Sequence, residues 1–129
     1  MTLPITTAFA AIAALILIAL SVSVILRRRA ASVALGAGGD EMLERKIRAQ
    51  ANFVEYAPFA VILVGLAEAQ GAGGAGLAAL AALFIAARLA HGYAMSLTAN
   101  APKSRLFGIA ATLTVVSLLA LWNLWLVIA

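Results

Sequence analysis

The sequence predicts an all-α integral membrane protein folded as a four-helix bundle. Of its 129 residues, 65% are hydrophobic and 11% are charged, whereas a soluble domain has about 25% charged residues. A bilayer core about 30 Å thick requires about 20 largely apolar residues in a helix, and four segments meet or approach this length. We expect one domain, residues 1–129, with helices at about residues 5–26, 42–70, 75–98 and 105–128.

The first helix, residues 5–26, is expected to be a membrane anchor and not a signal peptide. No basic residue precedes it, and the basic cluster 27–29 follows it. Lys and Arg accumulate on the cytoplasmic side of short loops, and eight of the nine basic residues lie in the first and third connectors. The N- and C-termini are therefore expected on the periplasmic or luminal side.

The second helix carries polar side chains into the bilayer. Asp40 is expected to cap it, with Glu41 and Glu44 near the positive helix end. Four side chains at spacings i, i+3, i+7 and i+10 fall on one stripe of a helix. They are Arg45, Arg48, Asn52 and Glu55.

The third helix has Arg88 deep within an apolar run, and His91 follows one turn later. An unpaired arginine at this depth is costly. Counted from the Gly-rich turn at 71–76, Glu55 lies about 15 residues away and Arg88 about 13, so at about 1.5 Å per residue they match in depth. We predict a buried ion pair between them, within one subunit or across two. Glu68 is too shallow and is expected at the outer interface, in contact with water.

The fourth helix opens with Arg105 at the cytoplasmic surface. Trp122 and Trp125 near its other end suit an interfacial aromatic belt. The Gly-rich connector before the third helix lacks the Lys-Ser/Thr of a phosphate-binding loop and is expected to be a flexible hairpin.

Composition excludes several kinds of site. Without cysteine, a disulfide framework, a thiolate metal site and a cysteine nucleophile are impossible. With a single histidine, we expect no metal site built by the protein. The net charge of +4 comes from residues at helix ends beside apolar runs, which indicates membrane topology and no nucleic-acid partner.

The inner end of the predicted bundle gathers several cations around one carboxylate. Such a site suits a small ligand with carboxylates and an ammonium. An alternative is that Arg45 and Arg48 face lipid headgroups, that Asn52 bridges helices, and that an ion pair merely locks the bundle. The polar residues collected there are Arg48, Gln50, Asn52, Glu55, Tyr56, Arg88, His91, Tyr93 and Arg105.

One run resembles the signature of the MAPEG family, the membrane-associated proteins of eicosanoid and glutathione metabolism. It is Glu44-Arg45-x-x-Arg48-Ala49-Gln50-x-Asn52-x-x-Glu55-Tyr56-x-Pro58. The run is similar to the leukotriene C synthase and microsomal glutathione transferase type. The segment from Arg88 to Tyr93, and Arg105 followed by Gly108, add to the resemblance, which extends over the whole chain in helix number and loop order.

The resemblance implies a homotrimer that binds glutathione as co-substrate between neighbouring subunits, near the cytoplasmic face. Arg105 would be the catalytic residue that stabilises the thiolate, because a nearby cation lowers the pKa of a thiol. One of Arg27, Arg28 and Arg29 would close the site. The implied glutathione-binding residues are Arg48, Gln50, Asn52, Glu55, Tyr56, His91 and Tyr93.

The implied function is that of a membrane-bound glutathione transferase, with or without peroxidase activity. The thiolate would add to an apolar electrophile, a hydrophobic small molecule or lipid from the bilayer. Ala51 and Met95 stand where prostaglandin-type members carry an arginine and a tyrosine, and the alanine-rich composition is typical of bacteria. The two departures and the composition disfavour an eicosanoid substrate, and the expected location is the inner membrane of a bacterium.

Two other functions are open. The same family contains a non-catalytic lipid-binding type, so a scaffold protein is the main alternative. A small proton-coupled exporter also has four helices in a short chain, but such exporters resemble each other in an acid within the first helix, and residues 5–26 contain none.

Overall fold

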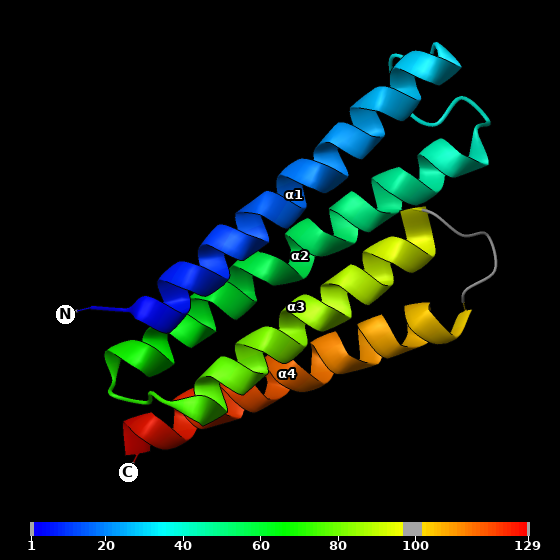
Figure 1. The fold of residues 1–129 in the computed structure, drawn as a ribbon. Coiled ribbons are helices and arrows are strands. Elements are labelled where there is room, and N and C mark those ends of the chain that lie inside the picture. The colour runs from blue at the N-terminus through cyan, green and yellow to red at the C-terminus, as the bar shows by residue number, and fades with distance from the viewer. Residues whose placement is uncertain (1, 97–101, 129) are drawn as a thin grey trace.

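The computed structural model describes residues 2–96 and 102–128 and contains four helices (Figure 1). They are α1 (Pro4–Ala31), α2 (Glu41–Ala69), α3 (Ala75–Ser96) and α4 (Pro102–Ile128). Each is long and apolar enough to cross a membrane, and none of the described residues forms a strand. The predicted all-α, four-helix membrane architecture is confirmed.

Two helix ends differ from the prediction. α1 continues through the basic cluster to Ala31 instead of ending at residue 26, because basic side chains in a last turn interact favourably with the helix dipole. α4 begins at Pro102 instead of residue 105, since proline suits the first position of a helix, where its missing N–H is not needed. The predicted end of the third helix at residue 98 lies outside the described residues.

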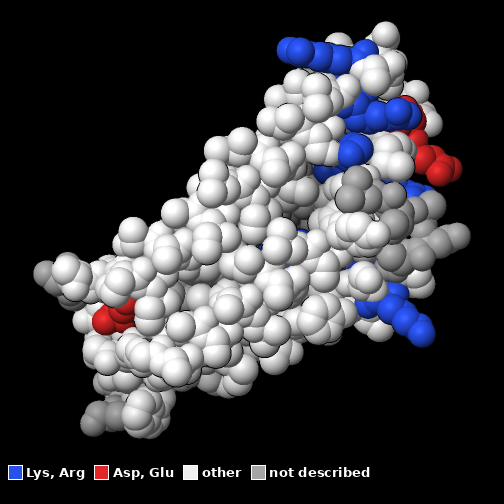
Figure 2. Space-filling model, in the orientation of Figure 1, with Lys and Arg blue, Asp and Glu red and all other residues white. Residues whose placement is uncertain are grey.

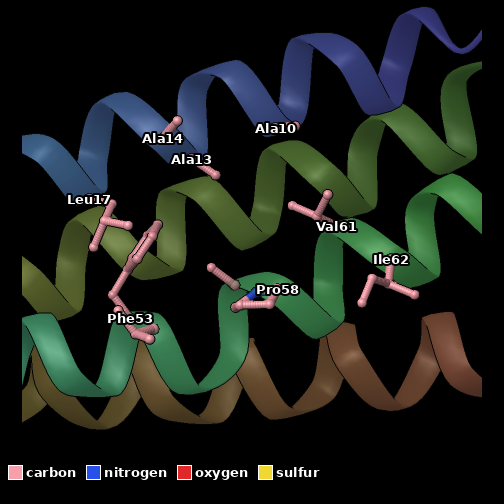
Figure 3. A pocket seen from close by; sticks show the side chains of 10 residues that line it. Ala10, Ala13, Ala14, Leu17, Phe53, Pro58, Val61 and Ile62 are labelled. Carbon is pink, nitrogen blue, oxygen red and sulfur yellow. The ribbon is translucent and has the colours of Figure 1, made fainter.

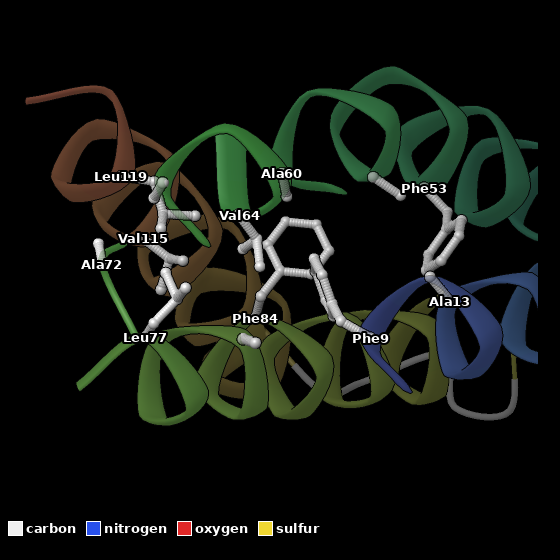
Figure 4. Close-up of a cluster of buried hydrophobic side chains, with 13 residues drawn as sticks. Phe9, Ala13, Phe53, Ala60, Val64, Ala72, Leu77, Phe84, Val115 and Leu119 are labelled. Atoms are coloured by element: carbon white, nitrogen blue, oxygen red, sulfur yellow. The ribbon is translucent and has the colours of Figure 1, made fainter. Parts of the chain in front are cut away.

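The two middle helices hold the bundle together. α2 and α3 each pack against all the other helices, whereas α1 and α4 do not contact each other over the described residues. The core is built mainly of alanine and a few large side chains, with the Phe9 and Phe84 rings edge to face at a centroid distance of 5.5 Å (Figure 4). Fully buried alanines such as Ala60 and Ala67 let helices approach closely in a membrane.

Charge separates the two ends of the bundle. Both termini lie at one end (Figure 1), and the Lys and Arg side chains gather at the opposite end, which we call the basic end (Figure 2). The basic end is defined by Arg27, Arg28, Arg29, Arg45, Lys46, Arg48, Lys103 and Arg105. The ninth basic residue, Arg88, lies in the interior of the bundle.

Glu68 caps α1 at the end of the bundle opposite the basic end. Its carboxylate accepts hydrogen bonds from the backbone N–H of Ile5 (2.9 Å) and of Thr6 (2.8 Å), and from the Thr6 hydroxyl (2.6 Å). The first N–H groups of a helix have no partner within the helix, and Leu3 at the N-cap of α1 offers no side-chain hydrogen bond. The end of α2 therefore satisfies the start of α1.

Asp40 caps α2 as predicted and also binds Arg27. One carboxylate oxygen accepts from the Leu43 N–H (2.7 Å), and the two oxygens accept from Arg27 Nε (3.1 Å) and Nη2 (2.6 Å). The hydrogen bond from Arg27, and then that from Leu43, lower the pKa of the Asp40 carboxyl. This contact joins the end of α1 to the start of α2 across the first connector.

Asp40→Asn is expected to lower the Tm at neutral pH, because asparagine still caps the helix but loses the ion pair. A carboxyl whose pKa is lower in the folded state stabilises that state above its unfolded pKa of about 3.9. The contribution is lost as the pH falls through the folded pKa. The Tm difference between wild type and variant should therefore shrink below about pH 4, as thermal unfolding of the detergent-solubilised protein across pH would show. Glu44→Gln, an exposed acid of the same first turn, is the control, and a difference that persists unchanged in acid would contradict the assignment.

Candidate functional site

A polar cavity lies between α2, α3 and α4, towards the basic end. Its volume is about 230 Å³. It brings together five of the predicted site residues, which are Arg48, Asn52, Glu55, His91 and Arg105. The remaining lining residues are Ala51, Met95 and Ile109. We call it the α2–α3–α4 cavity.

α2 supplies three of the polar side chains through its helical repeat. Arg48, Asn52 and Glu55 are separated by four and three residues, so they lie on one side of the helix. The opposite side is buried in the bundle, where Ala49 and Phe53 are 1% and 2% exposed. Arg48 and Glu55 are exposed and Asn52 is half-buried, so the polar stripe runs along the edge of the core.

Gly108 fixes how α4 meets α3 beside this cavity. A Cβ at Gly108 would lie 2.6 Å from His91 Cβ and 2.8 Å from the Ala87 carbonyl oxygen, which is closer than real Cβ contacts. The backbones can approach only because Gly108 has no side chain. The contact sets His91 against α4 one turn from Arg105. Within α4, the buried Thr112 donates its hydroxyl to the Gly108 carbonyl (2.6 Å).

Two polar atoms of the cavity lack partners. Asn52 Oδ1 and His91 Nδ1 are buried, and neither has a hydrogen-bond partner among the described residues. Buried polar atoms are normally hydrogen-bonded, and an exception needs an explanation. Because both residues line the α2–α3–α4 cavity, a polar molecule within it would supply the missing hydrogen bonds.

The predicted ion pair between Glu55 and Arg88 is wrong within one subunit. In the described part of the chain, the ion pairs are Arg27 with Asp40 and Arg45 with Glu41. Counting residues along the helices predicted that the two side chains lie at the same depth in the bilayer. It could not predict in which direction each side chain points. Glu55 is exposed and lines the α2–α3–α4 cavity, whereas Arg88 is 2% exposed and lines a different cavity, between α1 and α3. A pair across two subunits stays a prediction.

Three other predicted residues lie outside the α2–α3–α4 cavity of the same subunit. Gln50 Nε2 donates to the Ser21 hydroxyl of α1 (2.8 Å). Tyr56 is half-buried and packs against the core. Tyr93 lines a separate cavity between α1 and α3. Their contacts with glutathione would have to come from a neighbouring subunit and stay predictions.

The basic cluster at the end of α1 is also engaged elsewhere. Arg27 is held by Asp40, and Arg28 donates to the Gly36 carbonyl of the first connector (2.8 Å). Neither these two nor Arg29 lines the α2–α3–α4 cavity. The prediction that one of them closes a glutathione site therefore also depends on a second subunit.

A larger groove between α1 and α2 is entirely apolar (Figure 3). Its volume is about 380 Å³. It is lined by Ala10, Ala13, Ala14, Leu17, Phe53, Val54, Ala57, Pro58, Val61 and Ile62. α2 runs through Pro58 as one continuous helix. Without an ionisable side chain, the groove offers no group for acid–base or thiolate chemistry, in contrast to the α2–α3–α4 cavity.

Comparison with known proteins agrees with the family resemblance that the sequence of α2 shows. The model of the MAPEG family matches residues 6–127. The chain is 34% identical over 122 residues to the inner membrane protein YecN of Escherichia coli strain K12, covering 91% of this chain and 88% of that protein. The protein of the same name from Escherichia coli O6:H1 matches to the same extent.

Proposed function

Because this chain belongs to the MAPEG family, we propose that it is a membrane-bound glutathione transferase whose glutathione site includes the α2–α3–α4 cavity. The observation that carries the proposal is the pair of unpartnered atoms, Asn52 Oδ1 and His91 Nδ1, in a cavity that also contains Arg48 and Arg105. The charged ends of glutathione can pair with the two guanidinium groups, and its amide groups can hydrogen-bond to the two unpartnered atoms.

Charge complementarity supports glutathione as the ligand. The tripeptide carries two carboxylates and one ammonium at neutral pH. The α2–α3–α4 cavity offers two guanidinium groups, from Arg48 and Arg105, and one carboxylate, from Glu55. Guanidinium groups hold carboxylates through charge-assisted hydrogen bonds, and Glu55 is the group that would accept the ammonium.

One subunit supplies one wall of the site. Arg48, Glu55 and Arg105 are all exposed, so a neighbouring subunit can cover them. In the proposed homotrimer, the neighbour brings the predicted residues that this subunit directs elsewhere, which are Gln50, Tyr56, Tyr93 and one of Arg27, Arg28 and Arg29. The distribution of Lys and Arg supports an orientation in which the basic end faces the cytoplasm of a bacterial cell, with the site near the cytoplasmic surface of the inner membrane.

Arg105 is the proposed catalytic residue. Its positive charge favours the thiolate form of bound glutathione, because an opposite charge stabilises the ionised form of a thiol. The thiol proton passes to water, the thiolate sulfur forms a bond to an electrophilic carbon, and in a displacement the leaving group departs with the electron pair. The apolar electrophile reaches the sulfur from the bilayer, so no ionisable side chain is needed to bind it.

The binding step is tested by calorimetric titration of the detergent-purified protein with glutathione. Arg48→Ala should weaken binding about tenfold or more, since a hydrogen bond to a charged group contributes about 1.5–3 kcal/mol. Lys103→Ala is the matched control, because Lys103 is a cation of the basic end that does not line the α2–α3–α4 cavity. Absence of binding to wild type at millimolar glutathione would instead favour a non-catalytic lipid-binding or scaffold protein.

A further inference from the structure

A second cavity lies between α1 and α3, on a different side of α3. Its volume is about 290 Å³. Its lining combines apolar side chains with a few polar ones, and comprises Ile16, Ala19, Leu20, Ser23, Arg88, Leu89, Gly92, Tyr93 and Ser96. It shares no lining residue with the α2–α3–α4 cavity. We call it the α1–α3 cavity.

Buried polar groups without partners line the α1–α3 cavity. Arg88 is 2% exposed, and its Nε and Nη1 have no hydrogen-bond partner among the described residues. Ser96, which is 9% exposed, has an unpartnered Oγ. The guanidinium of arginine stays protonated in proteins, and a charge within a membrane-spanning helix is costly unless it is paired or hydrated. An anion bound in the cavity would pair this charge.

The acids of this chain are engaged or placed elsewhere. Asp40 binds Arg27, Glu41 binds Arg45, and Glu68 caps α1 at the end opposite the basic end. Glu44 is an exposed residue in the first turn of α2, at the basic end. Glu55 matches Arg88 in depth but lines the other cavity. The anion for Arg88 must therefore come from outside the subunit.

We propose that the α1–α3 cavity binds a long-chain carboxylate, with the carboxylate on Arg88 and the hydrocarbon chain along the apolar wall. The Arg88 nitrogens donate to the carboxylate. Ile16, Leu20 and Leu89 provide the apolar surface for the chain. This ligand is separate from glutathione and goes beyond the proposed transferase function.

Depth and size favour a fatty-acid carboxylate over a phospholipid headgroup. Arg88 lies eight residues before Ser96, which is about 12 Å along the helix axis, whereas the phosphate of a phospholipid stays in the headgroup layer. A cavity of about 290 Å³ accommodates one small head and the start of one chain more readily than a phosphodiester with two chains.

Equilibrium binding of radiolabelled hexadecanoate to the detergent-purified full chain tests the proposal. Wild type should bind saturably, and uncharged hexadecanol should compete at least about tenfold more weakly because it has no charged oxygen to accept a charge-assisted hydrogen bond. A phosphatidylglycerol should also compete at least about tenfold more weakly, because its phosphate stays in the headgroup layer and cannot reach the depth of Arg88. Arg88→Gln should reduce affinity about tenfold or more for the same reason. Equal competition by hexadecanol would overturn the assignment to the carboxylate, and stronger competition by phosphatidylglycerol would identify a phospholipid site instead.

Gly92→Leu tests the same cavity without removing a buried charge. An added Cβ at Gly92 lies 3.6 Å from Leu20 Cδ2, in ordinary contact, so the longer side chain occupies the cavity while α3 is retained. Hexadecanoate binding should fall at least about tenfold because the chain loses its apolar surface. Ala14→Leu, which fills the apolar groove between α1 and α2, is the matched control and should leave binding unchanged. A larger loss in Ala14→Leu than in Gly92→Leu would place the fatty acid in that groove and overturn the proposal.

Two further measurements distinguish this site from the glutathione site and from a contact with a neighbouring subunit. Millimolar glutathione should not displace hexadecanoate, and its displacement would show that Arg88 belongs to the glutathione site. Glu55→Gln should leave hexadecanoate affinity unchanged. An increase of tenfold or more in that variant would show that Glu55 of a second subunit occupies the guanidinium, and would restore the ion pair across two subunits.

Discussion

Gly108→Ala is expected to lower the Tm and to weaken glutathione binding together. The new Cβ would meet His91 Cβ at 2.6 Å and the Ala87 carbonyl oxygen at 2.8 Å, and the latter is a backbone atom that cannot rotate away. Overpacking of this kind costs about 1–3 kcal/mol. Relief of the clash requires α4 to move away from α3, which separates Arg105 from His91. Thermal unfolding and calorimetric titration of the same preparation would measure both effects.

Gly92→Ala is the control for the glycine substitution. It lies within α3, and its added Cβ meets Leu20 at an ordinary 3.6 Å. Since alanine is favoured over glycine in a helix interior by about 0.5–1 kcal/mol, this variant should be as stable as wild type or more so. An equal Tm for the Gly108 and Gly92 variants would contradict a close helix contact at Gly108.

Arg105→Ala is expected to lower kcat about hundredfold, the effect of removing one preorganised stabiliser of developing charge, with a smaller change in KM for glutathione. Conjugation of glutathione to a chlorodinitrobenzene, followed by absorbance, measures both constants. Without the cation, the bound thiol should ionise closer to its ordinary pKa of about 8.5, so the rate of the variant should recover as the pH rises.

Lys103→Ala should retain wild-type turnover in the same assay, because Lys103 does not line the α2–α3–α4 cavity. If Arg105→Ala raised KM while kcat stayed constant across pH, Arg105 would be a binding residue and the proposed thiolate chemistry would lack its cation.

The sequence predicted much of the fold because membrane helices are specified by length and hydropathy. The polar stripe of α2 was also predictable, since Arg48, Asn52 and Glu55 share a helix side through spacing alone. The predicted topology put His91 and Arg105 at the same end as this stripe, the family resemblance implied their roles, and the structure brings both to the same cavity as the α2 stripe. The spacing of residues along one helix does not depend on how the helices pack, so the sequence is enough to predict it.

Contacts between helices were less predictable because they depend on rotation about each helix axis. Matching Glu55 with Arg88 used depth, which sequence gives, but their directions depend on packing, and Arg88 points to the α1–α3 side. The same limit applies to Glu68, whose partners Ile5 and Thr6 lie more than 60 residues earlier in the chain. In the sequence, Gly108 was noted only as part of the family resemblance. Its close contact with His91 depends on how α3 packs on α4.

The most direct test of the glutathione site is an electron cryo-microscopy map of the full chain at saturating glutathione. The proposed function predicts density for a tripeptide in the α2–α3–α4 cavity, in contact with Arg48 and Arg105 and within hydrogen-bond distance of Asn52 Oδ1 and His91 Nδ1, with a neighbouring subunit covering it. Tripeptide density beside Arg88 in the α1–α3 cavity, or a map without tripeptide density at saturation, would contradict it.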